Sequence, residues 1–574
     1  MNKGKALILT LLSLLLLSLP WLLPGCGLLS LIAFVPLLCL DYIVDGCAYK
    51  RFFWWYFALF ALWNAVTTFW VANATLGGAV FAILYNALQM SLVWAVFRLS
   101  KKKFRGVLPY IFLAVMWIAW ERRYFFVDIS WPWLTLGNAF AQSTRLVQWY
   151  ELTGCLGGSL WIWACNLGIF GLVISLASLR WKSFNTKGRA AFLCSLALLL
   201  LAPIVASEIR YASYKEDSCG KLDVVVAQPN IDPYHKYGAM PQAQQNEALL
   251  QIFSSAPDSG VWQGDTPEDK IHLVAGALVE RQKNAPEFQK DSSSLSSIDS
   301  IAAGSRPRLY IAPESFTSDI FLNDPRSSAT VRTFAQWLSS RPGSEILFGA
   351  STYEFFYQNK RPSALARNNA PGQWYENRNS AILVDGSADV QIYHKSKLVV
   401  GTELTPLPAL FVPLDDALGG VMGRCIPQKE VSVLNVQDSI PVGSVVCYES
   451  IYGEYCTGYV SKGAQLLCVI TNDAWWGDTP GYRQHLSYSR LRAIETRRDI
   501  ARSANTGISA IINQRGDIVE KTSWWTPASI STEVNLSKKI TPYVQYGDIV
   551  GKLCSFVFLL LAAWLLVSLV IRKD

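Results

Sequence analysis

The sequence predicts a multi-pass α-helical membrane domain that carries an inserted water-soluble α/β domain. Of its 574 residues, 51% are hydrophobic and only 16% are charged, whereas soluble domains average roughly 25% charged residues. The apolar residues are also unevenly placed, because long apolar stretches fill the two ends of the chain. We therefore expect a membrane domain of about seven helices over residues 1–207, a soluble domain over 208–548, and a last membrane helix with a short tail over 549–574.

About eight segments are apolar enough to cross a bilayer, which takes about 20 residues. They lie near residues 6–24, 27–44, 52–73, 77–97, 106–120, 156–179, 190–207 and 549–571. The fifth segment is short, and its loss would move the soluble domain to the other side of the membrane.

The basic residues support eight spans and orient them. With the N-terminus inside, the cytoplasmic turns are rich in Lys and Arg, as in residues 98–105 and 180–189. The short outside loops hold only Arg122, Arg123 and Arg145. By the positive-inside rule, the soluble domain then lies outside the cytoplasm. The formal charge of +8 has its source mainly in cytoplasmic turns, so we do not expect nucleic-acid binding.

Within the soluble block, short β-branched runs alternate with helix-like stretches, which is typical of an α/β domain. The predicted strands are 222–227, 309–312, 346–349, 381–384, 442–446, 466–470 and 508–512. The clearest helices are 328–338 and 484–500. The polar, low-complexity stretch 291–305 indicates a solvent loop or an insertion.

Three reactive side chains each follow a strand-like run in this block. Glu314, Lys395 and Cys447 come after the runs 309–312, 390–393 and 444–446, and strand ends are where rigid scaffolds present catalytic groups. Thiol-dependent acyl transfer needs a nucleophile, a base and a cation for the oxyanion, and these three side chains supply them. Singly, they also fit a core cysteine, a helix-start glutamate and a solvated lysine, so only their combination indicates acyl chemistry.

The other cysteines and the histidines do not indicate a metal site. None of the twelve cysteines forms a Cys-x-x-Cys pair, and the four histidines are scattered along the chain, so no structural zinc site is expected. In the soluble block Cys219, Cys425, Cys456 and Cys468 accompany Cys447. A disulfide such as Cys425 to Cys456 stays open at this point.

Tryptophans mark a loop that is predicted to lie outside the membrane. The segment Ser130-Trp-Pro-Trp-Leu134 joins the fifth and sixth spans. It fits an anchor at headgroup depth, where Trp is enriched, and it also fits a surface that positions a lipid at the active site. The apolar segments 407–412 and 475–476 are candidates for lining a lipid entrance or for ordinary core packing.

Three short blocks surround the reactive residues: Ile311-Ala-Pro-Glu314-Ser, Tyr393-His-Lys395-Ser-Lys-Leu-Val with Glu403 beyond it, and Val446-Cys447-Tyr448-Glu449 with Gly453-Glu454. They resemble the three signature blocks of the nitrilase superfamily, in the same order. The stretches 471–477, 484–485, 502–507, 131–137 and 226–231 are similar to one branch of it, the apolipoprotein N-acyltransferases.

This resemblance implies that the inserted domain is a nitrilase-like αββα sandwich. It implies an enzyme of the bacterial inner membrane, with its catalytic domain on the periplasmic side, that performs the last step of lipoprotein maturation. The expected donor is a membrane phospholipid, and the expected acceptor is the N-terminal amino group of a diacylglyceryl-modified apolipoprotein. The acyl group would pass through a thioester on Cys447 in ping-pong order, with no cofactor or metal.

The resemblance also implies supporting residues. Glu403 would orient Lys395 or Glu314, Glu449 would hold the Cys447 turn, and Tyr448 would supply a backbone donor to the oxyanion. For both glutamates, a surface carboxylate that merely follows a strand is the plainer alternative.

Two features depart from the family pattern and bear on the shape of the loop over the active site. Lys395 is followed by Val400-Gly-Thr-Glu403 where the family usually has Pro-Phe-Gly-Glu, and the polar stretch from Gly260 to Pro307 looks like an insertion. Two alternative functions stay open. One is a membrane-anchored nitrilase-type amidase that uses water as the acceptor, and the other is a transporter or scaffold with an inactive outer domain.

Overall fold

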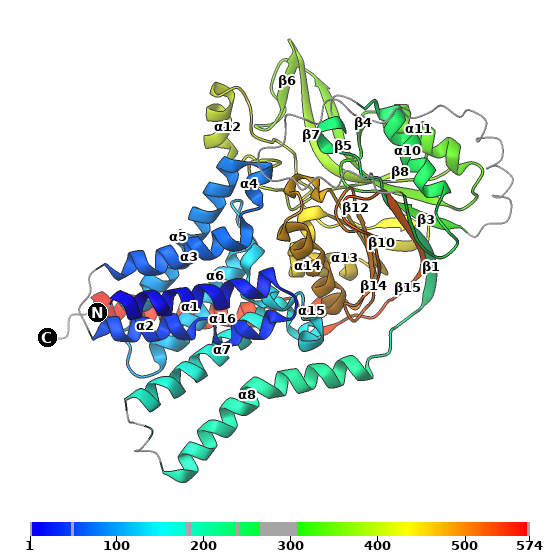
Figure 1. Cartoon of the computed structure of the whole chain (residues 1–574). Coiled ribbons are helices and arrows are strands. Elements are labelled where there is room, and N and C mark those ends of the chain that lie inside the picture. The colour runs from blue at the N-terminus through cyan, green and yellow to red at the C-terminus, as the bar shows by residue number, and fades with distance from the viewer. Residues whose placement is uncertain are drawn as a thin grey trace.

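The computed structural model describes residues 3–46, 51–178, 181, 185–236, 240–264 and 307–570. Two parts are visible in Figure 1: a bundle of long helices that holds both ends of the chain, and a sandwich of two β-sheets with helices on its outer faces. The predicted solvent loop 291–305, and most of the predicted insertion 260–307, lie outside the described residues.

Helices occupy all eight places where membrane spans are predicted. They are α1 (Lys3–Leu22), α2 (Val35–Asp45) after the 3₁₀ segment η1 (Cys26–Ile32), α3 (Phe52–Thr68), α5 (Leu76–Ser100), α6 (Leu108–Tyr124), α7 (Tyr150–Ala177), α8 (Thr186–Ser213) and α16 (Ile549–Val570). Among the described residues, six candidate spans are long and apolar enough to cross a membrane, with η1 and α2 counted as one. The helices α3 and α6 have 17 residues each, the lower limit for a span, so the number eight stays a prediction.

Aromatic side chains form the core of the bundle. Phe34 packs against Trp94, Trp117 and Trp163, with ring centroids 4.4 Å apart in the Phe34–Trp163 pair. Aliphatic side chains instead cover the outside, as on α16, where many Leu and Val residues are exposed. An apolar exterior around a packed aromatic core is what a bilayer solvent favours. The helix α8 contacts α7, whose Trp161 Nε1 donates to the carbonyl of Leu199 at 2.9 Å, and it leads to the first strand (Figure 1).

Among the described residues, the first sheet has nine strands. Its order is β2-β15-β1-β3-β5-β7-β6, with β4 beside β5 and β8 beside β7. The bounds are β1 (Gly220–Gln228), β2 (Gly260–Gln263), β3 (Arg308–Ile311), β4 (Thr317–Phe321), β5 (Glu345–Tyr357), β6 (Arg367–Ala370), β7 (Gln373–Val384), β8 (Val390–His394) and β15 (Ala528–Leu536). The strands β1, β3 and β5 are parallel, so their carboxyl ends meet at one edge of the sheet.

The second sheet has six strands in the order β14-β13-β12-β11-β10-β9. They are β9 (Leu434–Val436), β10 (Ile440–Val446), β11 (Leu466–Thr471), β12 (Ile500–Ala504), β13 (Ala510–Ile512) and β14 (Ile518–Lys521). The three central strands β10, β11 and β12 are parallel and buried. Near-continuous apolar runs are typical of such strands, which is why the sequence reveals β10 and β11.

The two sheets pack face to face. Along β1, Val224 and Val226 belong to a core shared with strands of the second sheet, whereas Val225 and Ala227 point to the opposite side. That outer side is covered by α10 (Gln242–Ser254) and α11 (Ala329–Leu338). The outer side of the second sheet is covered by α13 (Gly453–Ser461) and α14 (Pro480–Thr496). The resulting αββα sandwich confirms the predicted fold class. Short helices complete the fold: α4 (Val71–Ala74), α9 (Pro233–Lys236), α12 (Pro408–Ala417) and α15 (Pro542–Tyr546).

One predicted helix ends earlier than expected. The segment 484–500 was predicted as a helix, but α14 ends at Thr496 because Arg497 adopts the left-handed conformation with φ 50°. Ile500 instead opens β12. The prediction failed because Arg497 and Arg498 have good helix propensity, and their tertiary hydrogen bonds override it.

Candidate active site

Glu314 and Lys395, which both follow strands of the first sheet, form a buried ion pair. Glu314 follows β3 and Lys395 follows β8, and the Lys395 Nζ lies 2.9 Å from Oε1 of Glu314. The same ammonium group lies 2.9 Å from Oε1 of Glu403. Burial would lower the pKa of Lys395, but the two carboxylates outweigh burial and raise it well above the usual range. Lys395 is therefore a fixed positive charge in this site.

Asn379, in the long strand β7, connects the two carboxylates. Its Nδ2 donates to Oε1 of Glu314 at 2.7 Å and to Oε1 of Glu403 at 2.6 Å. Glu314 also accepts a hydrogen bond through Oε2 from the backbone N–H of Asn472 at 3.2 Å. Glu403 is fixed by the backbone N–H of Val399, 2.8 Å from its Oε2. No local sequence pattern marks Asn379 as a site residue, because many other polar residues occupy similar positions inside strands.

Cys447 lies directly after β10, at the start of the 3₁₀ segment η8 (Cys447–Ile451). Its φ is 49°, a left-handed conformation that residues with a Cβ adopt at a cost. Burial and the carboxylate of Glu314 raise the pKa of the Cys447 thiol well above its usual value, and Lys395 opposes them only in part. The thiol therefore stays protonated near neutral pH and would need a base to act as a nucleophile.

Glu449 binds the turn that carries Cys447. It is fully buried, and its two oxygens accept hydrogen bonds from the hydroxyls of Tyr393 and Tyr459 and from the backbone N–H groups of Ser396, Lys397 and Val446. Val446 precedes Cys447 and Ser396 follows Lys395, so one carboxylate holds both loops. The alternative of a surface carboxylate is wrong for Glu449.

The tryptophan loop packs against the same turn. It contains the 3₁₀ segments η2 (Pro132–Leu134), η3 (Leu136–Phe140) and η4 (Thr144–Val147). The ring of Trp131 stacks on Tyr448 with centroids 6.0 Å apart, and the Tyr448 hydroxyl donates to the carbonyl of Ser130 at 2.9 Å. Trp133 contacts Trp476 at 5.8 Å. The loop between α6 and α7 therefore touches the Cys447 turn directly.

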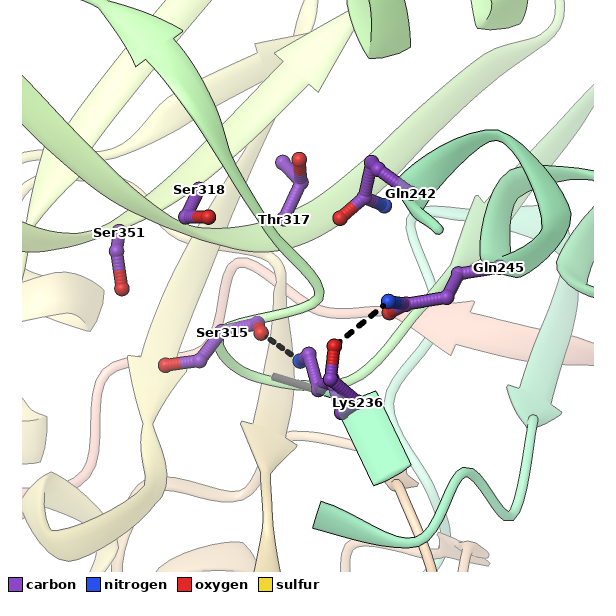
Figure 2. A pocket seen from close by; sticks show the side chains of 7 residues that line it. All are labelled: Lys236, Gln242, Gln245, Ser315, Thr317, Ser318 and Ser351. Carbon is purple, nitrogen blue, oxygen red and sulfur yellow. Dashed lines mark hydrogen bonds between the residues drawn. The ribbon is translucent and has the colours of Figure 1, made fainter. Parts of the chain in front are cut away.

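A small polar pocket lies beside Ser315, the residue after Glu314 (Figure 2). It is lined by Lys236, Gln242, Gln245, Ser315, Thr317, Ser318 and Ser351. The Lys236 ammonium group donates to the carbonyl of Ser315, the residue after Glu314. Burial lowers the pKa of Lys236 to about 8, although Glu314 acts in the opposite direction. The pocket measures about 20 Å³, which is room for one water molecule and not for an acyl chain.

One group of metal-type side chains occurs among the described residues. Ligand atoms of Cys447, Asp473 and His485 lie within 4.8 Å of one another. The guanidinium group of Arg502 already pairs with Asp473 at 2.8 Å, and a cation next to that group would be repelled. The donor set thus fits an ion-pair network better than a metal ion.

The cysteines whose pairing the sequence left open are free thiols. Cys425 accepts a hydrogen bond from the Asn377 amide at 3.2 Å, and the Cys456 thiol donates to the carbonyl of Glu449 at 3.5 Å. In this structure a Cys425–Cys456 disulfide is not formed.

Comparisons with known proteins match both parts of the chain. A carbon-nitrogen hydrolase family model matches residues 300–540, and a model of the apolipoprotein N-acyltransferase N-terminal domain matches residues 13–168. The chain is 28% identical to an apolipoprotein N-acyltransferase of Chlorobaculum tepidum and 25% identical to one of Geobacter metallireducens. Each of these alignments covers 92% of this chain and 89% of the relative. A solved nitrilase-superfamily structure from Saccharomyces cerevisiae aligns with 14% identity and a TM-score of 0.33, over 59% of this chain and 98% of that one.

The αββα sandwich, the membrane-type helices and these matches define the class of protein, a membrane-bound acyltransferase with a nitrilase fold. Within this class, the chain belongs to the apolipoprotein N-acyltransferase family.

Proposed function

We propose that the enzyme transfers a fatty acyl group from a membrane phospholipid to the N-terminal amino group of diacylglyceryl-modified apolipoproteins. This would be the last step of lipoprotein maturation. The observation that carries the proposal is the buried arrangement of one thiol, one carboxylate and one ammonium group, Cys447, Glu314 and Lys395. These are the groups that an acyl transfer through a thioester requires.

In the first half-reaction, Glu314 takes the proton of the Cys447 thiol while the sulfur attacks the ester carbonyl carbon of the phospholipid. The negative charge that develops on the carbonyl oxygen is stabilised by Lys395 and by the backbone N–H of Tyr448. The carbon–oxygen ester bond then breaks. The departing lysophospholipid oxygen takes the proton from Glu314, and a thioester remains on Cys447.

In the second half-reaction, the amino group of the acceptor attacks the thioester carbonyl. Glu314 takes a proton from the attacking nitrogen and returns it to the sulfur as the carbon–sulfur bond breaks. An amide is formed, and the free thiol of Cys447 is restored. Because the lysophospholipid leaves before the acceptor reacts, the kinetics are ping-pong.

Glu403 and Glu449 support this chemistry without reacting. Glu403 shares Lys395 and Asn379 with Glu314 and so keeps the ammonium group beside the base. Glu449 holds the backbone on either side of the site through Ser396 and Val446.

The membrane setting favours substrates with acyl chains. A soluble enzyme would have to extract such chains at about 0.8 kcal/mol for each exposed CH₂ group, whereas an active site at headgroup depth avoids this cost. On α12, the side chains of Leu410 and Leu414 are 64% and 53% exposed. In the view of Figure 1, α12 is drawn above α4. We assign this apolar helix to the lipid entrance.

The orientation follows from the charge pattern of the sequence. The basic turns lie in the cytoplasm, and the sandwich lies in the periplasm of a bacterial inner membrane, where apolipoproteins carry their lipid. Phospholipid, apolipoprotein and surrounding membrane lipids are thus the partners, and no cofactor takes part in these steps.

The test is to trap the acyl-enzyme. Purified enzyme in detergent, mixed with a phospholipid that carries a labelled acyl chain, should gain label that hydroxylamine removes. The variant Cys447→Ser should gain none, whereas Cys219→Ser, which removes an exposed thiol of the same domain, should label like the wild type. An unlabelled wild type that hydrolyses small amides would favour the amidase alternative. A wild type without either activity would favour the transporter or scaffold.

A further inference from the structure

A second buried network lies on the side of the Cys447 turn that faces α14. His485, in α14, and Asp473, in the 3₁₀ segment η9 (Asp473–Trp476), are both fully buried. The His485 Nδ1 lies 2.9 Å from Oδ1 of Asp473. The other ring nitrogen, Nε2, lies 3.1 Å from the carbonyl oxygen of Cys447 and 3.0 Å from the hydroxyl of Ser450.

The hydrogen positions in this network follow from counting donors. The Ser450 hydroxyl has one hydrogen, and it donates to the carbonyl of Cys447 at 2.8 Å. The His485 Nε2 faces that same carbonyl, so it must carry a hydrogen and donate to the Cys447 oxygen and the Ser450 hydroxyl. The Nδ1 lies 2.9 Å from Oδ1 of Asp473 and 3.2 Å from Nη2 of Arg502, and the shorter contact, which is to an acceptor, requires Nδ1 to donate as well. Both ring nitrogens are therefore donors, and neither has a lone pair free to accept a proton from the thiol.

Asp473 fixes the ring from behind. Its Oδ2 accepts a hydrogen bond from Arg502 at 2.8 Å, and its Oδ1, which faces His485, also accepts one from the Thr471 hydroxyl at 2.7 Å. Burial alone would raise the pKa of Asp473, but the charges of His485 and Arg502 outweigh burial and hold it at about 2. The carboxylate is thus a permanent acceptor that holds the imidazole in one orientation.

The network acts at a strained position. Cys447 has its φ at 49°, which few residues with a Cβ adopt unless their surroundings impose it. Two hydrogen bonds to the Cys447 carbonyl, from His485 and Ser450, act on the peptide group directly after its Cα. Glu449 holds the preceding residue, Val446, at 2.9 Å. The backbone is thereby held on both sides of the nucleophile.

The same histidine contacts the tryptophans that join the sandwich to the membrane helices. Its ring centroid lies 5.9 Å from that of Trp133 and 5.4 Å from that of Trp476. The next residue back, Gln484, donates to the carbonyls of Trp21 and Thr67, both at 3.2 Å. The orientation of His485 is therefore set partly by the helices of the bundle.

We propose that His485, oriented by Asp473, is a positioning residue that holds the Cys447 carbonyl and so keeps the thiol in line with Glu314 and Lys395. It is not a second general base. This inference rests on the proposed function only in naming acylation as the step that it serves.

The kinetic test compares His485→Ala, His485→Gln and the control Ser487→Ala. Ser487 lies on the same helix, and its hydroxyl bonds within that helix to the carbonyl of Arg483. For His485→Ala we expect kcat for thioester formation to fall about tenfold to a hundredfold, the effect of one charge-assisted hydrogen bond. The KM for phospholipid and the pH profile of kcat should not change. In His485→Gln, the amide NH₂ can still donate to the Cys447 carbonyl, so part of the rate should return.

A second measurement needs neither lipid nor acceptor. The rate at which iodoacetamide alkylates Cys447, followed by mass spectrometry of its peptide, should fall in His485→Ala and recover in His485→Gln. If the enzyme transfers no acyl group but keeps this alkylation pattern, the proposed function fails and the positioning role stands.

Two results would overturn the inference. One is a wild-type rate in His485→Ala. The other is loss of one limb of the pH profile with no recovery in His485→Gln, which would make the imidazole an acid or a base. If His485→Ala does not fold, the rates of thioester formation in Ser450→Ala and Asp473→Asn test the inference instead. Each must slow acylation at unchanged KM for the inference to survive, because each removes one end of the same hydrogen-bond chain.

Discussion

The substitution Glu449→Gln tests the network around Cys447 with a change of one atom. The carboxylate is fully buried and accepts hydrogen bonds through both oxygens. At Oε2 the backbone donor is Val446 at 2.9 Å, and at Oε1 it is Ser396 at 2.7 Å. A glutamine keeps the shape but places an NH₂ group at one of these two positions. In either orientation, one buried backbone N–H then faces another donor.

The expected size of the effect follows from these contacts. A buried backbone donor without a partner costs about 1–3 kcal/mol, and hydrogen bonds to a charged group are stronger than to a neutral amide by about 1 kcal/mol each. Together the change destabilises the local structure by about 3–5 kcal/mol, allowing for partial relaxation. If the loss is felt in the transition state for acylation, the rate of thioester formation on Cys447 falls about a hundredfold to a thousandfold or more.

The assay follows labelled acyl transfer to Cys447 in detergent under single-turnover conditions. Glu430→Gln is the matched control, because the Glu430 side chain is 86% exposed and its nearest basic partner, Lys462, is 3.5 Å away. It should react like the wild type, since exposed ion pairs contribute about 0–1 kcal/mol. A folded Glu449→Gln enzyme that acylates within about threefold of the wild type would refute the reasoning, because the carboxylate would then not control the geometry of the turn.

Three further outcomes can be measured on the same preparation. Burial raises the pKa of Asp499 to about 6 from 3.8, so the folded state binds its proton more tightly, and the resulting stability, up to about 3 kcal/mol, is lost as pH rises from 4 through 6. The apparent Tm of the wild type should therefore fall over this pH range, whereas that of Asp499→Asn should not. An identical fall in both proteins would contradict the assignment. Glu151→Gln breaks a buried ion pair with Arg497, 2.6 Å apart, and should lower the apparent Tm by about 5–10 °C. The control Glu208→Gln, which breaks an exposed ion pair, should shift the apparent Tm by no more than about 1 °C. Equal shifts in the two variants would be inconsistent with a role for burial. Leu410→Glu on the exposed face of α12 should slow acyl transfer from donors in vesicles more than from short-chain donors in solution, and equal slowing of both would remove α12 from the lipid entrance.

The strand-end residues could be predicted from the sequence because each follows a short apolar run. Glu314 and Cys447 end central parallel strands of different sheets, β3 and β10, and such strands are recognisable by their unbroken apolar residues. That Glu314 and Lys395 meet at 2.9 Å could not be derived from these runs. Both residues follow strands of the first sheet, and their meeting depends on its strand order, in which β5 and β7 separate β3 from β8.

The partners of these residues were beyond prediction for a different reason. Asn379 lies inside β7, and its amide bonds to Glu314 and Glu403 across loops far apart in the chain. A polar residue on a strand ordinarily marks the solvent side. Here the neighbouring sheet covers it, and no local pattern distinguishes it from an exposed asparagine.

The burial of α14 is another feature that its local sequence pattern does not predict. The sequence places Leu486, Leu491 and Ile494 on it and arginines on its other faces, which is the pattern of a helix with one side in water. In the structure, Arg492 and Arg497 are fully buried as well. The helix is enclosed because the sandwich covers one side and the membrane helices cover the other, so the arginines bond to carbonyls and carboxylates of both parts.

This enclosure links the chemistry to the membrane helices. Arg497 pairs with Glu151 at the start of α7, and Gln484 bonds to the ends of α1 and α3. Between them, His485 contacts the Cys447 carbonyl. Buried polar groups tolerate little displacement, because every bond they lose leaves an unpaired partner in a low dielectric. A shift of the helix bundle against the sandwich would therefore be transmitted through α14 to the backbone of Cys447, the proposed nucleophile. The bundle thus holds the Cys447 turn as well as anchoring the chain in the bilayer.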